Sequence, residues 1–511
     1  MGSVSRRRFL GTTAWVAVGA VASPTLASAW KTLPPGAAGT GYFEHSFGIT
    51  DGLCRKVLAE ALAKGGDWAE LFFEHRVGNW LTLEDGKVSR ASSDVALGVG
   101  IRCVEGDQIG YGFTQQLNEA SMLAAARTAA TIANQAATRP SASFRRIPFG
   151  DAYPLDRLFG AVPVESKVQL VQSVNEKCFA RSPLIVKVTA QYHDEEKRIL
   201  VVGSDGTKAE DLQPKSYLTT TVVVEKDGKR ERAGWGYGGR RAFSFYTPTL
   251  VDEIARKAVD RSVVLFEAVK PPAGEVPVVL GPGSTGVLLH EAIGHGMEAD
   301  FNRKKTSTYA TMIGRKVAEP LVTIVDDGTL PNLLGSINFD DEGTPSQRTV
   351  LVDQGILTSY LHDRISARHY GVKPTGNGRR ESYEHYVQPR MRNTLMLAGA
   401  ATPEDVIRQA GKGIYVEDVS NGQVQIGEGD FAFYVSQGRM IEDGKLTAPI
   451  KDVNIMGNGP KMLANIGMVA NNLEMSLHGT GACGKGGQRA PCGFGQPTVL
   501  VQSLTVGGVK S

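Results

Sequence analysis

Cysteine is scarce in this chain of 511 residues, and other features are missing as well. The five cysteines are odd in number and widely spaced, which does not indicate a disulfide framework. Net charge is only +3, and no basic tract is interleaved with aromatic residues, so nucleic acid is not an expected partner. Beyond the N-terminal region, no segment is apolar for long enough to span a membrane. With 41% hydrophobic and 21% charged residues, the composition is that of a globular protein.

The first 29 residues have the features of an export signal. Arginines at 6–8 are followed by Phe-Leu, a weakly apolar run at 12–22 and a small-x-small cleavage site at 27–29. We predict that residues 1–29 are a twin-arginine signal peptide and that the mature protein is periplasmic or otherwise exported, with no stable membrane insertion after cleavage. An uncleaved anchor is the alternative, but the apolar run is short and Pro24 interrupts it.

Apolar periodicity predicts an α+β fold in two parts. Residues 45–270 are expected to form an N-terminal domain of antiparallel sheet and helices, built from two helix-then-strands units at about 45–138 and 164–270. A segment rich in Pro, Arg and Ser, 139–163, separates these units. Residues 273–511 are expected to form a β-rich, sandwich- or barrel-like C-terminal domain that carries a chemically distinctive helix.

Periodic segments give the individual elements. Asp51 is expected to cap the first helix. The expected helices are 51–64, 119–136, 163–180, 249–268 and 402–410. The clearest expected strands are 69–74, 79–83, 96–102, 110–113, 187–192, 219–224, 275–280, 321–325 and 349–352.

The stretch 281–300 holds the strongest chemical signal. It places His290, Glu291 and His295 on one predicted helix directly after the strand 275–280. A His-Glu pair followed by a second His is how many zinc hydrolases present two metal ligands and a general base. From these residues alone, metal binding and two unrelated histidines near a helix end are both open.

The spacing of the two histidines is unusual. A separation of five residues puts their side chains roughly 140° apart on a regular α-helix, which is too wide for two ligands of one ion. A local π-bulge would bring them to one face, and such bulges are frequent at functional sites. Gly294 and Gly296 would give the backbone the freedom for this distortion. The sequence therefore predicts a distorted helix at His290–His295.

Two histidines need a third ligand, and the glycine-rich segment around Cys483 offers one. A thiolate is a good zinc ligand, and small neighbours let it approach an ion closely. A buried, inert cysteine is the alternative. Cys492 and His478 are weaker candidates. Glu298 and Asp300 would either orient the histidines or be solvated side chains beside a helix end.

Two further loops are rich in charged or polar residues. The acidic loop 340–345 lacks alternating oxygen ligands and is interpreted as a turn. The polar loop 375–383 carries Arg379 and Arg380, which would hold a substrate carboxylate or backbone, or instead pin the loop by salt bridges. The remaining histidines, His45, His75, His193, His362, His369 and His385, have no metal-like spacing.

Several segments resemble the TldD branch of the TldD/PmbA peptidases, in the same order along essentially the whole mature chain. The most specific are Leu289–Arg303, Val325–Thr329, Asp341–Pro345, Pro374–Ser382, Cys483–Lys485 and Gly495–Thr498.

The resemblance implies a zinc metallopeptidase that hydrolyses unfolded peptides. One zinc ion would be held by His290, His295 and Cys483, with Glu291 as general base. A PmbA/TldE-type subunit, which lacks the metal motif, would be the partner, or the chain would form a homodimer. Members of the family are typically cytosolic, whereas this chain begins with an export signal.

Two other interpretations follow from the same residues. A non-catalytic assembly or regulatory subunit of a TldD/PmbA-type complex would keep the metal for structure, with a closed set of four ligands. A secreted oxidoreductase would use Cys483 and Cys492 and would join them in a disulfide.

Overall fold

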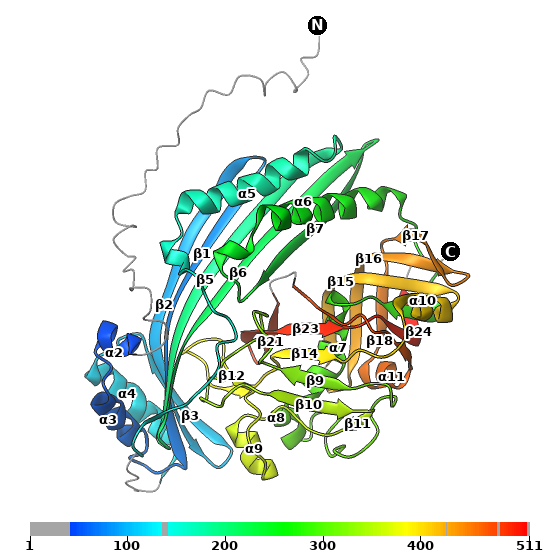
Figure 1. Cartoon of the computed structure of the whole chain (residues 1–511). Coiled ribbons are helices and arrows are strands. Elements are labelled where there is room, and N and C mark those ends of the chain that lie inside the picture. Colours follow the sequence, from blue (N-terminus) through cyan, green and yellow to red (C-terminus); the bar gives the residue numbers. More distant parts are fainter. Residues whose placement is uncertain (1–40, 135–141, 426, 478–480, 508–511) are drawn as a thin grey trace, which may run out of the picture. The chain divides into compact units, whose positions relative to one another are not determined.

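The first half of the protein builds one large sheet. The computed structural model describes residues 41–134, 142–425, 427–477 and 481–507, so the signal peptide predicted at 1–29 lies outside the described residues. Within the sheet the order is β3-β2-β1-β5-β6, and β7 and the short β4 both pair with β6 (Figure 1). The strands are β1 (Trp68–Glu84), β2 (Lys87–Glu105), β3 (Gln108–Thr114), β4 (Arg145–Arg146), β5 (Ile185–Gly203), β6 (Thr207–Lys226) and β7 (Lys229–Gly239).

The pairing of β1 with β5 is the centre of this sheet. These strands run antiparallel, with Glu70 opposite Gly203 and Glu84 opposite Thr189. The two strand groups predicted from the sequence therefore share one continuous sheet. The boundaries predicted for the domains stay predictions.

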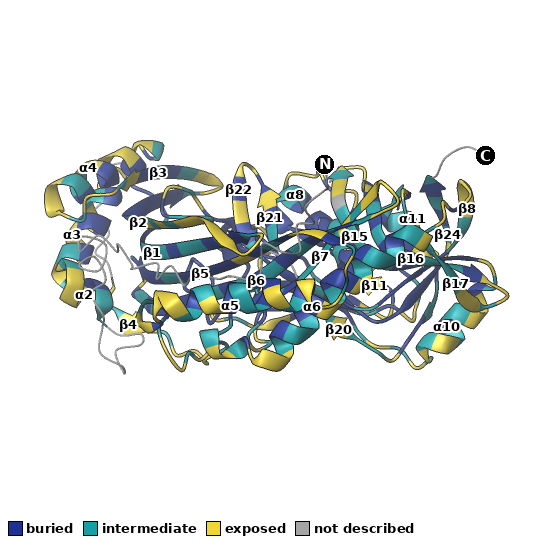
Figure 2. Cartoon of the chain, turned by 90° about the horizontal axis from the view of Figure 1, so that it is seen from above, coloured by how far each residue is buried: buried dark blue, intermediate teal, exposed yellow. Residues whose placement is uncertain are grey.

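Helices cover one face of the sheet. They are α2 (Tyr42–Phe47), α3 (Asp51–Ala61) and α4 (Glu119–Ala129) at one end, and α5 (Val164–Phe179) and α6 (Pro248–Val263) at the other. Figure 2 shows exposed residues on the outer sides of α5 and α6 and buried residues on the strands. Thr50, not Asp51, caps α3, because its hydroxyl accepts a hydrogen bond from the Leu53 amide.

Alternation along the strands decides which residues meet the helices. In β1, Leu71 and Phe73 pack with α3 and α4, while Leu81 and Leu83 pack with α5 and α6. Successive side chains of a strand point to opposite faces. The even-numbered residues of β1 therefore face the other way, toward the C-terminal half, as Phe72 does where it packs against Phe339 and Tyr383.

Five strands of the C-terminal half close into a barrel. They pair in the ring β8-β24-β18-β16-β15, and β15 also pairs with β8. β17 pairs with β16 and β19 with β24. The strands are β8 (Gly274–Leu280), β15 (Gly413–Gln425), β16 (Asp430–Glu442), β17 (Lys445–Ile450), β18 (Asn454–Asn458), β19 (Ile466–Val469) and β24 (Val499–Gly507).

A second C-terminal sheet has the order β11-β10-β9-β14-β23-β20, and two hairpins lie beside it. Its strands are β9 (Ile324–Asp327), β10 (Arg348–Asp353), β11 (Ile356–Leu357), β14 (Asn393–Met396), β20 (Glu474–Met475) and β23 (Gly493–Gln496). The hairpins are β12 (Gly378–Arg379) with β13 (Gln388–Pro389), and β21 (Ala482–Lys485) with β22 (Gln488–Pro491). The helices are α7 (Val287–Leu289), α8 (Ala299–Arg303), α9 (Arg364–Tyr370), α10 (Pro403–Ala410) and α11 (Gly459–Ala464).

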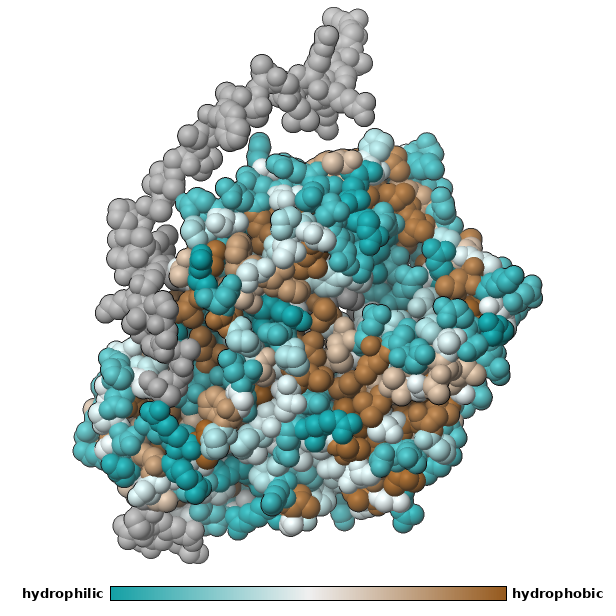
Figure 3. All heavy atoms as spheres, in the orientation of Figure 1, coloured by the Kyte–Doolittle hydropathy of each residue, from teal (hydrophilic) through white to brown (hydrophobic). Residues whose placement is uncertain are grey.

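The histidine-bearing segment packs into the core of the barrel. Leu288, Ile293 and Met297 are fully buried in the same cluster as Val278 of β8 and Val499 of β24. On the surface shown in Figure 3, hydrophobic residues lie in small groups among hydrophilic ones, as is normal for a folded chain. The α+β fold with a barrel-like C-terminal domain, predicted from the sequence, is confirmed.

Candidate metal centre

The segment after β8 is helical but irregular. It passes from the single turn of α7 into a π-helical turn, His290–Gly294, and then into a 3-10 turn, His295–Met297. The wider π turn brings the imidazole rings of His290 and His295 to a centroid distance of 5.1 Å. The distorted helix predicted from the five-residue spacing is confirmed.

The structure gives a different reason for a glycine at position 294 from the one expected from the sequence. Its φ of −56° is ordinary for a helix, so no special backbone freedom is used. A Cβ at this position would overlap the Met391 sulfur. Gly294 is therefore required because the π turn packs closely against Met391.

Cys483 reaches the histidines from the hairpin β21–β22. Its Sγ lies 3.0 Å from His295 Nε2, although 188 residues separate the two in the chain. All three of His290, His295 and Cys483 are buried, and one ligand atom of each lies within 4.8 Å of the others. The structure thus brings together the three residues predicted as ligands. His478, the weaker candidate, lies outside the described residues.

The surroundings favour the thiolate form of Cys483. A hydrogen bond from the Cys492 thiol is the largest cause that lowers the pKa of Cys483, and His290 and His295 lower it further against the effect of burial. That same hydrogen bond raises the pKa of Cys492 well above its ordinary value. The five cysteines are all free, so the disulfide required by the oxidoreductase interpretation is not formed.

These three side chains suit a divalent metal. The Nδ1 atom of His290 is buried without a hydrogen-bond partner among the described residues. Imidazole nitrogens and thiolates are both typical zinc ligands, and three protein ligands are the number found at catalytic zinc sites. The residues present therefore fit a zinc ion.

Glu298 holds His295 in place. Its Oε2 lies 3.0 Å from His295 Nδ1, which leaves Nε2 directed toward Cys483. Burial raises the pKa of Glu298, but Lys485 and His295 together bring it below its ordinary value. Lys485 Nζ lies 3.2 Å from Glu298 and 2.7 Å from Asp300. Glu298 thus contacts a predicted ligand directly, whereas Asp300 acts through Lys485.

Glu291, the glutamate between the two histidines, is partly accessible to solvent. Its side chain is 21% exposed, and its Oε2 lies 3.7 Å from His295 Nε2. His290 and His295, by contrast, are almost completely buried. Glu291 therefore stands at the open side of the cluster, where it can meet a water molecule or a substrate.

The two arginines of the polar loop have different partners. The guanidinium of Arg380 pairs with Glu70 of β1 and pins the loop to the first sheet. Arg379 donates to the carbonyls of Met391 and Pro491, at 2.8 and 2.6 Å. The loop 340–345, interpreted as a turn, is buried in part and pairs through Glu342 with Arg102 of β2.

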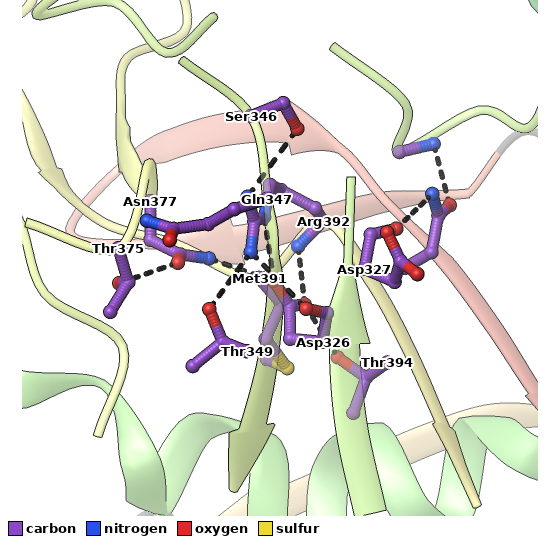
Figure 4. Close-up of polar contacts among 12 residues, drawn as sticks. Asp326, Asp327, Ser346, Gln347, Thr349, Thr375, Asn377, Met391, Arg392 and Thr394 are labelled. Atoms are coloured by element: carbon purple, nitrogen blue, oxygen red, sulfur yellow. Dashed lines mark hydrogen bonds and ion pairs between the residues drawn. The ribbon is translucent and has the colours of Figure 1, made fainter. Parts of the chain in front are cut away.

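Sequence reasoning missed a buried ionic cluster that supports the centre. Figure 4 shows Asp326 of β9 among Arg392, Asn377 and Thr394. Arg392 Nε lies 2.7 Å from Asp326 Oδ1, and the Asn377 amide donates to the same oxygen at 2.9 Å. Through Arg392, this cluster holds the backbone two residues after Arg390. The guanidinium of Arg390 in turn donates to the Cys483 carbonyl. The only signal in the sequence was that Asp326 and Asn377 lie in the family-like segments 325–329 and 374–382, whereas Arg392 and Thr394 lie in neither.

Comparison with known families covers most of the chain. Models of PmbA/TldA metallopeptidases match it in three successive parts, domain 1 at residues 69–133, the central domain at 157–266 and the C-terminal domain at 273–508. The chain belongs to the TldD/PmbA metallopeptidase family. This confirms the resemblance found in the sequence.

Similar proteins are named as metalloproteases, and one of them carries the name of the TldD branch. The chain is 41% identical over 454 residues to the metalloprotease TldD homolog of Haemophilus influenzae, covering 87% of this chain and 93% of that protein. It is 30% identical over 431 residues to a metalloprotease of Methanothermobacter thermautotrophicus, covering 84% of this chain and 92% of that one. At the level of the family, the protein is a peptidase-type enzyme whose chemistry involves a metal ion.

Solved structures of other proteins show the same fold. A protein of Bacteroides thetaiotaomicron described as a modulator of DNA gyrase superposes with a TM-score of 0.72 at 21% identity, covering 90% of this chain and 100% of that one. TldE of Thermococcus kodakarensis gives a TM-score of 0.69 at 19% identity, covering 89% and 99%. Among the described residues, none of the helices is both long and apolar enough to cross a membrane.

Proposed function

We propose that the protein is a zinc-dependent endopeptidase that hydrolyses unstructured peptides, with one zinc ion held by His290, His295 and Cys483. The observation that carries this proposal is the buried cluster of two imidazoles and a thiolate in a member of a metallopeptidase family. A zinc ion bound with an open fourth position would lower the pKa of a water molecule toward about 7 and polarise the scissile carbonyl.

The residues around the cluster divide the remaining work. Glu298 accepts the Nδ1 proton of His295 and keeps the Nε2 lone pair available for a ligand bond. Cys492 donates to the Cys483 sulfur, which supports the thiolate. Glu291, partly exposed beside His295, takes the proton of the attacking water and returns it to the leaving amine. Because these groups act on the peptide bond itself, weak selectivity for sequence is expected.

Replacement of Glu291 tests the mechanism. Glu291→Gln should keep the metal content of the parent and lower peptide cleavage at least about 100-fold, because the amide cannot accept the proton. Metal analysis and cleavage of a casein-like unfolded substrate would be measured on the same preparation. Glu319→Gln, which changes a glutamate of 33% side-chain exposure away from the cluster, is the matched control. Cleavage by metal-loaded Glu291→Gln at the parental rate would refute the assignment.

We also propose a partner subunit and a cellular location for the enzyme. The family and the likeness of fold to TldE support assembly with a PmbA/TldE-type partner or with a second copy of this chain. The paired arginines of the N-terminal segment support export by the twin-arginine route. Fractionation of cells that express the full chain, with and without replacement of both Arg6 and Arg7 by Lys, would test the export.

A further inference from the structure

A large cavity lies beside the candidate metal centre. Its volume is about 970 Å³, and it is lined by the inner face of β1, β5 and β6, by the loop 379–385 and by the hairpin β21–β22. Gly481, Ala482 and Pro491 line it, whereas neither histidine of the cluster nor Glu291 does. The hairpin that carries Cys483 is therefore a wall shared by the cavity and the metal centre.

The cavity has an excess of positive charge. Seven arginines and lysines line it, against four aspartates and glutamates. Most of the cations already have partners within the protein. Arg76 and Lys215 both pair with Glu195, at 3.2 and 3.0 Å, and Arg380 pairs with Glu70.

Two buried arginines in the cavity wall are not neutralised in this way. Arg240 and Arg379 are only 3% and 4% exposed, and neither forms an ion pair with a carboxylate in the described part of the chain. The Arg240 guanidinium donates to the Pro214 carbonyl, at 3.4 Å, and lies 4.9 Å from the centroid of the Tyr153 ring, while its Nε has no hydrogen-bond partner among the described residues. The carboxylates of Asp211 and Asp341 act on these two charges from a distance, but neither forms an ion pair with them. A buried guanidinium without a paired carboxylate is costly, so the two arginines favour the binding of an anion.

The two guanidinium groups act on each other. Burial lowers the pKa of Arg379 to about 10, and the positive charges of Arg240 and Arg390 add to this against the nearby Asp341. The Asp341 carboxylate itself accepts a hydrogen bond from the Arg380 amide. An anion between Arg240 and Arg379 would relieve their repulsion.

The rest of the wall indicates the kind of anion. Trp80, Tyr217, Leu334 and Ile337 give the cavity an aromatic and apolar side that suits the side chains of a peptide. The four acidic residues of the lining would repel a multiply charged phosphate more than a single carboxylate. Glu384 and Arg489 line the cavity and are exposed, so it reaches the protein surface.

We propose that this cavity binds a carboxylate of the peptide substrate between Arg240 and Arg379, either the C-terminal carboxylate or an acidic side chain. The inference rests on the proposed peptidase function and gives it a substrate class, namely peptides with a carboxylate that anchors in the cavity. Arg379 also donates to the Pro491 carbonyl in the hairpin wall. An anchored peptide is thereby held against the hairpin that presents Cys483.

Peptide binding tests the anchor without cleavage. The full chain with Glu291→Gln is titrated into an N-terminally labelled ten-residue peptide, and fluorescence anisotropy gives Kd. One peptide has a free C-terminal carboxylate and no acidic residue, a second has a C-terminal amide, and a third has the amide and one internal glutamate. The second peptide should bind about tenfold more weakly than the first, because it lacks a charge-assisted hydrogen bond.

The third peptide identifies the source of the carboxylate. Binding as tight as the first peptide assigns the site to acidic side chains as well, and binding as weak as the second assigns it to the C-terminus. Arg240→Gln should abolish the difference between the peptides, whereas Arg232→Gln, an exposed arginine of β7 outside the cavity, should preserve it. Equal affinity of all three peptides for the Glu291→Gln protein overturns the proposal, and that comparison does not depend on the folding of either arginine variant.

A parallel cleavage assay separates this inference from the proposed function. Metal-loaded protein with Glu291 intact is given the same three peptides. Cleavage of all three with equal Kd values leaves the peptidase in place and removes the anchor. A clear preference in binding with no cleavage of any peptide leaves a carboxylate site and removes the peptidase function.

Discussion

The carboxylate of Glu298 shows how one buried residue organises the metal centre. Its Oε2 contacts His295 and Lys485, and its Oε1 lies 3.7 Å from Arg390 Nε. Arg390 in turn donates to the Cys483 carbonyl. Two of the three predicted ligands are thus oriented by a single charged group and its partners.

Replacement of this carboxylate should weaken metal binding more than folding. Glu298→Gln keeps the size of the side chain but removes the negative charge that faces His295 and Lys485. We expect a loss of about 10- to 100-fold in metal affinity, measured by competition with a chromogenic chelator. Glu404→Gln, in the first turn of α10, is the control, because this residue is exposed and far along the chain from the centre. An unchanged affinity in Glu298→Gln would contradict the orienting role.

The sequence predicted the residues of the centre better than their partners. His290 and His295 stood out because a glutamate directly follows the first histidine, as in zinc hydrolases, although their spacing required a distorted helix, and Cys483 stood out because glycines surround it. Arg390 and Arg240 carried no such signal. Their roles depend on contacts such as the one between Arg390 and Cys483, 93 residues apart, and nothing local in the chain encodes these.

At the scale of the element, the π turn depends on close packing from outside. Gly294 lies against Met391, and Gly296 lies against the ring of Tyr309. The π turn and the 3-10 turn that follows it are therefore each packed against a neighbouring side chain, Met391 for the first and Tyr309 for the second.

A methyl group at Gly294 should disturb this element. Gly294→Ala places a Cβ into the Met391 sulfur, and we expect a cost of about 1–3 kcal/mol in the free energy of unfolding, together with weaker metal binding. Chemical denaturation followed by metal titration would measure both. Gly484→Ala is the matched control in the neighbouring hairpin, where a Cβ would meet nothing within 4 Å. Equal stability of the two variants would show that the turn tolerates the added volume.

Helices and strands with a clear hydrophobic periodicity were predicted with nearly correct boundaries. The pairing of the strands with one another was not predicted. The helix predicted at 402–410 is α10 (Pro403–Ala410), and the strand predicted at 275–280 is β8 (Gly274–Leu280). Alternation shows which face of a strand is apolar, but it does not name the strand that lies beside it. The long pairing of β1 with β5 joins segments about a hundred residues apart, so it could not be predicted from local pattern.

At the scale of the whole molecule, buried charges join the first sheet to the C-terminal half. Arg102 of β2 is fully buried, and it pairs with Glu70 and with Glu342, 240 residues further along the chain. Arg380, in the loop 379–385 that lines the cavity, also pairs with Glu70. The inner face of the sheet is thus tied to the loops beside the metal centre.

Removal of Arg102 should destabilise the whole protein. Arg102→Gln leaves Glu70 and Glu342 buried without this positive charge, and we expect a loss of about 3–5 kcal/mol in the free energy of unfolding. Urea denaturation followed by tryptophan fluorescence would measure it. Arg127→Gln breaks only the exposed pair with Glu60 and should cost less than about 1 kcal/mol. Similar losses in the two variants would contradict the role assigned to the buried network.

The position of Cys483 in the chain also determines when, during synthesis, the proposed set of three metal ligands becomes complete. At a translation rate of about 5–20 residues per second, the ribosome adds the 188 residues between His295 and Cys483 in roughly 10–40 s. β24, which pairs with both β8 and β18 in the barrel, is made later still. A nascent chain therefore carries its histidines and glutamate for many seconds without the thiolate. If Cys483 completes the metal centre that we propose, the unfolded nascent chain is protected from its own cleavage until synthesis is nearly finished.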